Sequence, residues 1–384
     1  MIKKKVVIIN TGPFPEGDAG AVRLRFVAQA LVEAGFSVEV LCRGKANDEG
    51  FIEGIYYKSL KRSEGSRIFR GIDYYCFLGR AKQYLRKNRD IDCIYIYNAQ
   101  ISVFEYCKKL HKKRGICLVH DCVEWYSPDE FINGEKNIAY KNNNKINTKT
   151  VDNSYRVIAI SRFLQKHFTD RGIATMRLPI LCDSRLRMVP KQSSEKLTLF
   201  YAGVPFRKDY VGNVLKAALL LTPEEREQLR VILVGTTKGY LIHHSDIPEE
   251  VIEASKDFLE IYPRMPRQEV LQHMEMADFT ILPRDASRRY AQAGFPSKVV
   301  ESLANATPVL CNYSSDLELY LQDGENALIA KDHTPEELAK TIHRAIKLTA
   351  SEKIEMSKNA LKSAADYFDY RLYINELKSF IENS

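Results

Sequence analysis

The sequence predicts an α/β protein of two domains, each built on a parallel sheet. Its 384 residues exceed what one hydrophobic core usually serves. Short apolar runs alternate with amphipathic helical stretches twice along the chain, an alternation typical of parallel sheets. A polar stretch at residues 190–196 separates the two series. Hydrophobic residues make up 45% and charged residues 28%, which indicates a globular chain rather than a disordered or fibrous one.

In the first series, apolar runs predict strands and the amphipathic stretches between them predict helices. The strands are expected at residues 5–9, 37–42, 93–97, 116–120 and 156–160, and the helices at residues 22–34, 101–113 and 162–170. Asp18 and Ser161 precede helices and are expected to cap them. Arg23 is expected on an exposed first turn, and residues 141–147, rich in asparagine, are expected to form a loop or a frayed helix.

The second series repeats the pattern. Its strands are expected at residues 197–203, 231–235, 259–262, 278–283 and 307–312, and its helices at residues 211–221, 267–276, 296–304 and 335–348. A last helical stretch, residues 366–382, suits packing on either domain. Two such domains would form a cleft between the carboxyl ends of their strands, where open α/β sheets bind ligands.

The most informative motif is AGFPSKVVESLANATPV at residues 293–309. Gly294 gives a flexible approach and Pro296 suits the first helical position, so the N–H groups of residues 297–299 would face an anion. Glu301 lies one turn further on, on the same face as Ser297, where its carboxylate can accept hydrogen bonds from two hydroxyls. A phosphate next to a diol indicates a nucleotide ligand.

Two adjacent cations, Arg207 and Lys208, follow the strand that ends at Gly203. At the carboxyl end of a strand they would neutralise a diphosphate, and the alternative is a pair of solvated loop charges. The first loop, residues 11–21, includes Gly20 among its three glycines and would let backbone approach a ligand. Its spacing is not the dinucleotide fingerprint G-x-G-x-x-G.

His120 and Asp121 end the strand at residues 116–120, at the edge that faces the expected cleft. Together they would orient a sugar or share a proton, and a purely structural histidine is the alternative. Asp90 and Asp92 have the D-x-D spacing of some metal sites. They precede a strand rather than follow one, so no metal site is expected there.

The formal charge of +8 is concentrated at residues 67–87 and 108–114. These stretches are either solvated surface or surfaces attracted to anionic lipid headgroups, and no recognised module indicates nucleic acid. The eight cysteines have irregular spacing without a Cys-x-x-Cys pair, which is typical of reduced thiols in a cytoplasmic protein. No segment has the length of a membrane span or of a signal-peptide core.

Assembled in order, these segments resemble glycosyltransferase family 4, the retaining nucleotide-sugar transferases of GT-B fold. The matching segments are VDNSYRVIAISRFLQKHF at 151–168, YAGVPFRK at 201–208, RMP at 264–266, ADFTILP at 277–283, GFPSKVVE at 294–301 and DGENA at 323–327. The resemblance implies two Rossmann-like domains: residues 1–190 for the acceptor and residues 191–365 for the donor. Residues 366–384 would form a helix that packs back on the first domain.

The resemblance also implies an activity. A sugar would pass, without metal or cofactor, from a nucleoside-diphosphate donor, most naturally a UDP- or GDP-sugar, to a glycan or lipid-linked acceptor. This places the chain in bacterial cell-surface polysaccharide or glycolipid synthesis, in the cytoplasm and peripherally on the inner face of the membrane.

Individual residues take roles from the family. Arg207 and Lys208 would hold the diphosphate as catalytic groups, with His120 and Asp121 near the reacting sugar. Glu301 would bind the ribose. The remaining donor-binding residues would be Gly20, Gly203, Arg264, Met265, Gly294, Phe295, Pro296, Ser297 and Lys298.

One position departs from the family pattern. Many members carry two glutamates spaced E-x7-E, and here Ala293 stands at the first position while Glu301 fills the second. The substitution implies altered donor choice or geometry. It also leaves open a non-catalytic nucleotide-sugar binding or scaffold protein, and an epimerase or phosphorylase on the same two-domain plan.

Overall fold

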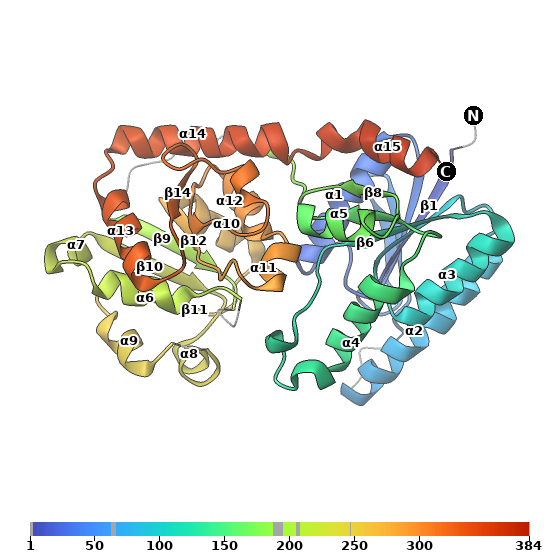
Figure 1. Ribbon diagram of the computed structural model, residues 1–384, viewed down its shortest axis with the longest axis horizontal. Helices are drawn as coiled ribbons and strands as arrows, with labels where there is room; N and C mark the ends of the chain where they lie inside the picture. Colours follow the sequence, from blue (N-terminus) through green and yellow to red (C-terminus); the bar gives the residue numbers. More distant parts are fainter. Residues whose placement is uncertain (1–2, 63–66, 187–194, 205–207, 246, 384) are drawn as a thin grey trace. The chain divides into compact units, whose positions relative to one another are not determined.

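The computed structural model describes residues 3–62, 67–186, 195–204, 208–245 and 247–383 (Figure 1). The chain forms two compact units. The first comprises Met1–Leu181 with Tyr370–Ser384, and the second is Cys182–Asp369. The sequence placed these boundaries at residues 190 and 365, so the first boundary comes earlier in the chain than expected and the second comes later.

The first unit is built on an eight-stranded sheet. Its strands are β1 Lys5–Asn10, β2 Ser37–Cys42, β3 Glu49–Ile52, β4 Ile55–Ser59, β5 Cys93–Asn98, β6 Cys117–Cys122, β7 Arg156–Ala159 and β8 Thr175–Arg177. Their order across the sheet is β3-β4-β2-β1-β5-β6-β7-β8. Only the β3–β4 pair is antiparallel among these described strands, so the expected parallel sheet is confirmed.

Helices cover both faces of this sheet. They are α1 Ala19–Glu33, α2 Arg67–Lys87, α3 Ile101–Arg114, α4 Ile138–Lys145, α5 Arg162–Thr169 and α15 Ile374–Glu382. Helix α15 lies beside α1 (Figure 1). Leu24 and Leu31 of α1 share one buried cluster with Leu377 and Ile381 of α15 and with β1. The last helix therefore belongs to the first unit although the whole second unit precedes it in the chain.

The second unit has a six-stranded sheet whose strands are all parallel among the described residues. They are β9 Leu197–Ala202, β10 Leu229–Val234, β11 Leu259–Tyr262, β12 Phe279–Leu282, β13 Val309–Asn312 and β14 Ala327–Ala330. Their order is β11-β10-β9-β12-β13-β14. The chain runs outward from β9 in one direction and from β12 in the other, so the strand order reverses between these two strands.

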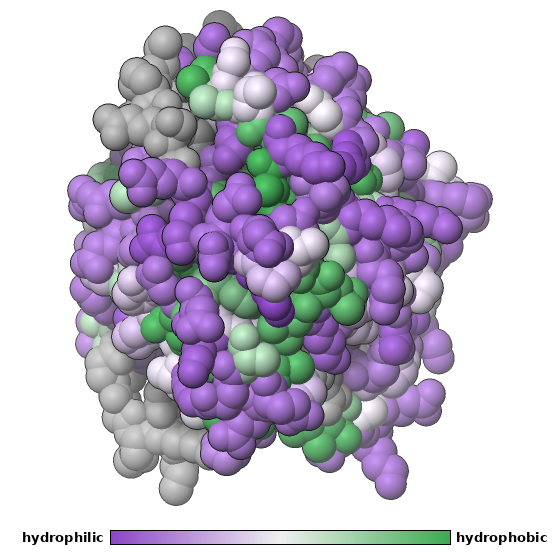
Figure 2. All heavy atoms as spheres, turned by 90° about the vertical axis from the view of Figure 1, so that its left-hand side faces the viewer, coloured by the Kyte–Doolittle hydropathy of each residue, from purple (hydrophilic) through white to green (hydrophobic). Residues whose placement is uncertain are grey.

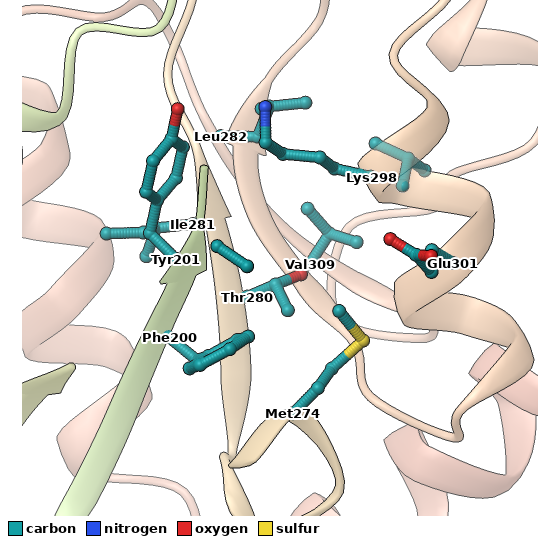
Figure 3. Close-up of a pocket in the computed structure, with 11 residues that line it drawn as sticks. Phe200, Tyr201, Met274, Thr280, Ile281, Leu282, Lys298, Glu301 and Val309 are labelled. Carbon is teal, nitrogen blue, oxygen red and sulfur yellow. The ribbon is translucent and has the colours of Figure 1, made fainter. Parts of the chain in front are cut away.

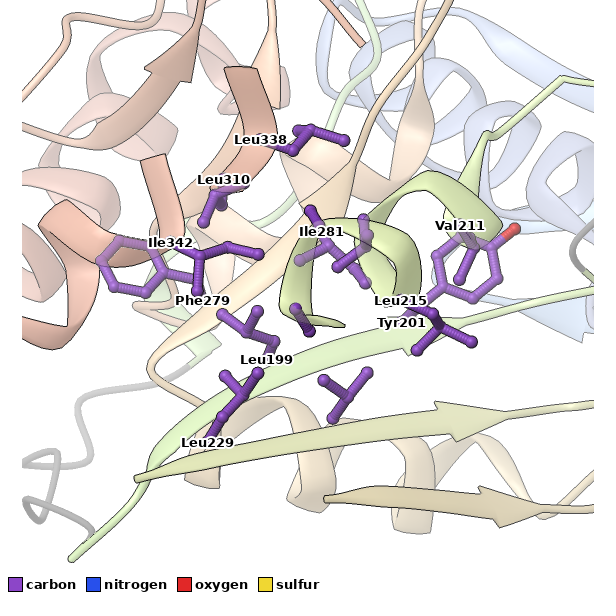
Figure 4. Packing of buried hydrophobic residues seen from close by; sticks show 14 of the residues in the cluster. Leu199, Tyr201, Val211, Leu215, Leu229, Phe279, Ile281, Leu310, Leu338 and Ile342 are labelled. Carbon is purple, nitrogen blue, oxygen red and sulfur yellow. The ribbon is translucent and has the colours of Figure 1, made fainter. Parts of the chain in front are cut away.

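Two helices pack on one face of the second sheet. The helices of this unit are α6 Val211–Leu219, α7 Pro223–Glu227, α8 Lys238–His244, α9 Glu249–Ala254, α10 Arg267–Met276, α11 Arg289–Ala293, α12 Ser297–Ala304, α13 Pro335–Ile346 and α14 Ala350–Tyr367. Figure 4 shows Leu215 of α6 and Ile342 of α13 against Leu199 and Ile281 of the strands. Met274 of α10 packs on the opposite face, so the sheet is covered on both sides, as parallel sheets require.

Figure 2 shows a face that is mostly hydrophilic, with apolar side chains in small groups. Among the described helices, none combines the length and the apolar character needed to cross a bilayer. Of the cysteines, Cys76 is exposed and Cys117 half-buried, and the rest are buried free thiols.

Candidate active site

The strand order of the second sheet places its candidate site at the carboxyl ends of β9 and β12. In open α/β sheets the crevice outside such a reversal is the usual ligand site. The segment after β9 carries Lys208 and Asp209, the segment after β12 carries Arg284, and α12 begins at Ser297. Hydrogen bonds join these segments, since the Tyr210 N–H donates to the Pro283 carbonyl at 2.9 Å.

Asp209 is the centre of a cluster of charges at this edge. Its Oδ1 accepts from Arg284 Nε at 2.7 Å, and its Oδ2 accepts from Lys298 Nζ at 2.9 Å. The hydroxyl of Tyr201, on β9, also donates to Oδ2, at 3.0 Å. Asn312 fixes Arg284 further, because its side chain bonds both the N–H and the carbonyl of Arg284, each at 2.8 Å. The two cations are therefore held in defined positions.

The electrostatics of the cluster favour an ionised carboxylate. Asp209 is only 5% exposed. Burial alone would raise its pKa, but the charges and hydrogen bonds of Arg284 and Lys298 outweigh burial and hold the pKa below its usual range. Arg284 and Lys298 thus place two positive charges beside one carboxylate. The excess of positive charge suits an anionic ligand.

Lys208 is positioned by an aromatic ring. Its ammonium lies 5.6 Å from the ring centroid of Tyr290, and the Tyr290 hydroxyl donates to the Lys208 carbonyl at 3.1 Å. Arg207, the other cation expected to hold a diphosphate, lies outside the described residues. Asp209 and Arg284 were not identified in the sequence, although each follows a strand at the same edge as Lys208.

Gly203 leaves room for the side chain of Lys298. Its φ of +138° is a backbone conformation that residues with a Cβ rarely adopt. A Cβ at this position would lie 3.1 Å from Cε of Lys298. The glycine expected near the ligand thus permits the lysine to reach Asp209.

Helix α12 starts one residue later than expected. Pro296 is its N-cap, and the Val299 N–H donates to the Pro296 carbonyl at 3.0 Å. Only Ser297 and Lys298, of the three expected donors, keep N–H groups without a helical partner in the first turn. Phe295 is buried, and its ring packs on Tyr320 and Phe368 at centroid distances of 5.6 and 5.9 Å.

Gly294, just before this segment, bonds from its N–H to the carbonyl of Tyr290 at 3.0 Å and so ends α11. Because the ring of Phe295 is engaged in the core, the 294–296 segment presents backbone rather than side chains to a ligand.

Glu301 forms an ion pair with Arg267 at the start of α10. Arg267 is more than half exposed, so a ligand can displace it from the carboxylate. Figure 3 shows Glu301 and Lys298, both on α12, beside a narrow pocket between α12 and the strands. Phe200 and Met274 line its apolar floor, and its volume of about 10 Å³ holds a single water molecule.

Arg264 and Met265 follow β11 at the same carboxyl edge of the sheet. Arg264 is exposed, whereas Met265 is half-buried and packs against the cluster that contains Phe200 and Met274. Met265 therefore packs beside residues that also line the pocket at Lys298.

In the first unit, Arg23 is buried, at 1% exposure, which makes the expected exposed position wrong. Its Nε and Nη2 donate to the two oxygens of Asp121 at 2.9 and 2.8 Å, and its Nη1 donates to the Pro179 carbonyl at 2.8 Å. The Tyr95 hydroxyl also donates to Asp121, at 2.7 Å. Asp121 is thus occupied by a buried ion pair that ties α1 to β6.

His120 lies within β6 rather than at its end, and it points to the opposite face from Asp121 because neighbouring strand residues alternate. The expected proton sharing between the two is therefore wrong. The His120 ring meets Phe104 of α3 and Phe168 of α5 edge-on, at 5.1 and 6.4 Å. Burial lowers the pKa of His120, which keeps the ring neutral at pH 7.

Gly20 lies inside α1 rather than in the preceding loop. A Cβ there would come within 2.9 Å of the Tyr97 ring on β5, so the glycine lets the helix approach the sheet. Asp18 caps the helix through a 3.0 Å bond from the Ala21 N–H, and Ser161 caps α5 through the Leu164 N–H, both as expected.

The asparagine-rich segment is helical, in agreement with the helical one of the two alternatives expected for it. It forms α4 and a following π-helical turn, and its side chains fasten the segment after β6. Asn143 Nδ2 and Asn147 Nδ2 donate to the Glu124 carbonyl at 3.1 and 3.2 Å, and Asn144 accepts from Trp125 Nε1 at 2.9 Å. These asparagines thus connect the helical segment to the residues that follow β6.

Asp90 and Asp92 lie before β5, where both contact Lys5. The Lys5 N–H donates to Asp92 at 2.7 Å, and the Lys5 ammonium is 3.5 Å from Asp90. In the described part of the chain, no group of three or more His, Cys, Asp or Glu side chains is arranged to hold a metal ion.

Comparison with known proteins agrees with this fold. Residues 20–180 match the family model Glycosyltransferase Family 4, and residues 184–363 match the model Glycosyl transferases group 1. Sucrose-phosphate synthase from Thermosynechococcus elongatus has a similar structure, with a TM-score of 0.76, 16% identity and 99% of each chain covered.

Two further solved structures are similar. HepE from Anabaena, in complex with UDP and glucose, gives a TM-score of 0.66 at 16% identity over 97% of each chain. WaaG, a glycosyltransferase involved in lipopolysaccharide biosynthesis, gives 0.68 at 14% identity over 99% of this chain and 100% of WaaG. At such identities these likenesses establish the fold alone. A search of curated sequences found no significant match.

The GT-B glycosyltransferase fold has two units built on parallel sheets, as this chain does. Here the cation cluster lies where the strand order of the second sheet reverses, between β9 and β12. The two family models, which together span most of the sequence, show that the chain belongs to glycosyltransferase family 4.

Proposed function

We propose that the chain transfers a sugar from a nucleoside-diphosphate donor, with UDP- and GDP-sugars as the first candidates, to a hydroxyl of a glycan or lipid-linked acceptor. The observation that carries the proposal is the Asp209 cluster, which holds Arg284 and Lys298 at the carboxyl edge of β9 and β12. HepE, a protein of the same fold, is described as a complex with UDP and with UDP-glucose.

In this proposal the diphosphate binds Lys298, Arg284 and Lys208, together with the free N–H groups at the start of α12. These charges are fixed before the reaction, so they stabilise the negative charge that develops on the departing diphosphate. The sequence assigns Arg207 to diphosphate binding as well. Glu301 accepts hydrogen bonds from the ribose hydroxyls once Arg267 moves aside, and backbone near Arg264 and Met265 meets the base.

Transfer would retain the anomeric configuration by attack on the same face as the leaving group. The bond from the sugar C1 to the phosphate oxygen breaks, and its electron pair leaves with the diphosphate. The acceptor oxygen bonds to C1, and its proton passes to the departing phosphate oxygen. A double-displacement path needs a nucleophilic carboxylate. Position 293 is alanine, and Asp121 is engaged by Arg23, so neither supplies one.

The proposed setting is bacterial cell-surface polysaccharide or glycolipid synthesis, at the inner face of the membrane. Exposed Lys109, Lys112 and Lys113 on α3 offer a basic surface to anionic lipid, whereas Lys108 and Arg114 are engaged. Lys108 pairs with Asp152 at 2.8 Å, and Arg114 donates to backbone carbonyls of α2 and the residues that follow it. Flotation with phosphatidylglycerol vesicles, compared for the wild type and Lys112→Ala/Lys113→Ala, tests this surface.

Calorimetric titration with UDP, GDP and ADP tests the donor site. We expect one nucleotide to bind with a micromolar Kd, and Lys298→Met to weaken it at least tenfold. Lys256→Met, which removes an exposed lysine from the same unit, should bind as the wild type does. Failure of every nucleotide to bind, or equal affinity in Lys298→Met, would refute the proposed donor site. Unchanged sugar transfer in Arg207→Ala/Lys208→Ala would refute the role of that pair.

Ala293 motivates a second candidate, a non-catalytic nucleotide-sugar binding protein. Ala293 is fully buried, and its methyl group offers no polar atom to a donor sugar. Tight nucleotide-sugar binding without release of nucleoside diphosphate across a broad acceptor panel favours this candidate over the transferase. Release of free sugar phosphate instead would indicate a phosphorylase.

A further inference from the structure

The first unit has a polar pocket of its own, between α2 and the β3–β4 hairpin. Its volume is about 490 Å³, within the range of small-molecule sites. Four cations, one carboxylate and a tyrosine are the chemically informative part of its lining: Lys58, Arg62, Arg80, Lys87, Glu49 and Tyr84. The lining therefore carries a net charge of +3, four positive charges less one negative charge.

Two of the four cations are neutralised within the protein. Lys58 pairs with Glu49 on the neighbouring strand, and Arg80 pairs with the buried carboxylate of Asp73. Arg80 Nη1 also donates to the Leu60 carbonyl at 2.6 Å, which fixes its guanidinium beside the end of β4.

Arg62 and Lys87 differ from this pair, since both are exposed and make no side-chain ion pair within the described residues. Lys87 ends α2, and Arg62 follows β4. Lys87 lines the pocket from α2 and Arg62 lines it from the segment after β4, so both charges are available to an anion in the pocket. Tyr84 offers less, because its hydroxyl already donates to Glu39.

The pocket is connected to the first ligand-facing loop of the sheet. The carboxylate of Asp73 accepts hydrogen bonds from Arg80 and also from Arg43 Nε, the latter at 3.4 Å. The backbone N–H of Arg43 donates to the Gly12 carbonyl at 2.9 Å. β4 is two strands away from β1 in the sheet order. At the usual strand spacing this separation is about 10 Å.

We propose that this pocket binds a phosphate or diphosphate of the acceptor. The proposal rests on the transferase function above and names the class of its acceptor. A carboxylate would compensate only one of the two positive charges that Arg62 and Lys87 leave unpaired, whereas a phosphate or diphosphate compensates both. The hydroxyl that receives the sugar would then lie about 10 Å from the bound anion, near the carboxyl end of β1. The phosphate belongs either to a lipid-linked sugar diphosphate or to a water-soluble sugar phosphate.

Calorimetric titration of the full chain with inorganic pyrophosphate, in saturating UDP, tests the pocket. UDP occupies the donor site, so the remaining pyrophosphate binding reports the first unit. We expect Arg62→Ala/Lys87→Ala to weaken it at least tenfold. Arg86→Ala/Lys378→Ala removes the same charge from exposed helical positions outside the pocket and should change it less than threefold. Neither pair contacts the core, so an unchanged Tm should accompany both.

The outcomes separate the two proposals. If UDP binds but pyrophosphate does not bind to the UDP-loaded protein, the pocket proposal fails while the donor site stands. Equal weakening in both double variants also overturns it, because general electrostatic attraction explains that result. Geranyl diphosphate distinguishes the sources: binding at least tenfold tighter than pyrophosphate supports a lipid-linked acceptor, and equal affinity supports a soluble sugar phosphate.

Discussion

Replacement of Asp209 by asparagine should destabilise the second unit by about 3 kcal/mol. Removal of one partner from a buried ion pair costs about 3–5 kcal/mol, because the remaining charge stays buried without compensation. The side chains of Arg284 and Lys298 are 11% and 32% exposed, so both regain some hydration and the lower figure applies. For a unit of this size the expected fall in Tm is about 6–12 °C.

The pH dependence of this loss provides a second check. The pKa of Asp209 is lower in the folded protein than in the unfolded chain. Its contribution is therefore fully present above about pH 4, the unfolded pKa, and is lost as the pH falls toward the folded value. The stability difference between the wild type and Asp209→Asn should shrink between pH 7 and pH 3.

Differential scanning calorimetry at several pH values measures both effects. Asp285→Asn is the control, since Asp285 lies next to Arg284 after β12 but pairs with the half-exposed Arg288, and should cost less than about 1 kcal/mol. In the Asp209→Asn/Lys298→Met double variant, the loss should be smaller than the sum of the single losses. A loss below about 1 kcal/mol for Asp209→Asn, or one that is equal at pH 7 and pH 3, would contradict the reasoning.

Three further changes test other parts of the structure. Glu301→Gln should weaken UDP binding about tenfold, because it loses charged hydrogen bonds worth about 1.5 kcal/mol. It should leave the binding of pyrophosphate unchanged. Equal weakening of UDP and pyrophosphate binding would exclude a contact between Glu301 and the ribose. Gly203→Ala should lower the free energy of unfolding, measured in urea, by about 1–3 kcal/mol, and it should weaken UDP binding because the new methyl group displaces Lys298. Stability and UDP binding equal to those of the wild type would contradict the assigned packing. Arg23→Met should lower the free energy of unfolding by about 3–5 kcal/mol, because it leaves the carboxylate of Asp121 buried without its partner. Arg23→Met/Asp121→Leu should recover part of this stability. A loss in the double variant that equals or exceeds the loss in Arg23→Met would count against the ion pair.

Much of the fold could be predicted because its strands are short apolar runs buried on both faces. The expected bounds of β2, β11 and α10 match the structure at both ends. Helix α2 was missed because, among its residues whose burial is described, the buried ones are a narrow stripe of Asp73, Phe77, Ala81 and Leu85. The carboxylate of Asp73 interrupts the apolar periodicity that marks a helix.

The candidate site could be predicted only where the residues that form it lie close together in the sequence. The start of α12 and Lys208 could be inferred locally. Asp209 could not, because Arg284 and Lys298, its partners, lie 75 and 89 residues away in sequence. The strand period alone, by contrast, excludes proton sharing between His120 and Asp121, since consecutive residues face opposite sides of a sheet.

The division of the chain has a consequence for its synthesis. The second unit is a continuous segment, whereas the first needs α15 to cover the apolar face of α1. On the ribosome, the first unit must wait while the second is made, roughly 10 to 40 s at about 5–20 residues per second. During that time Leu24 and Leu31 lack their partners Leu377 and Ile381. The domain that is translated first is therefore the one completed last, and its unfinished form is a natural client for chaperones.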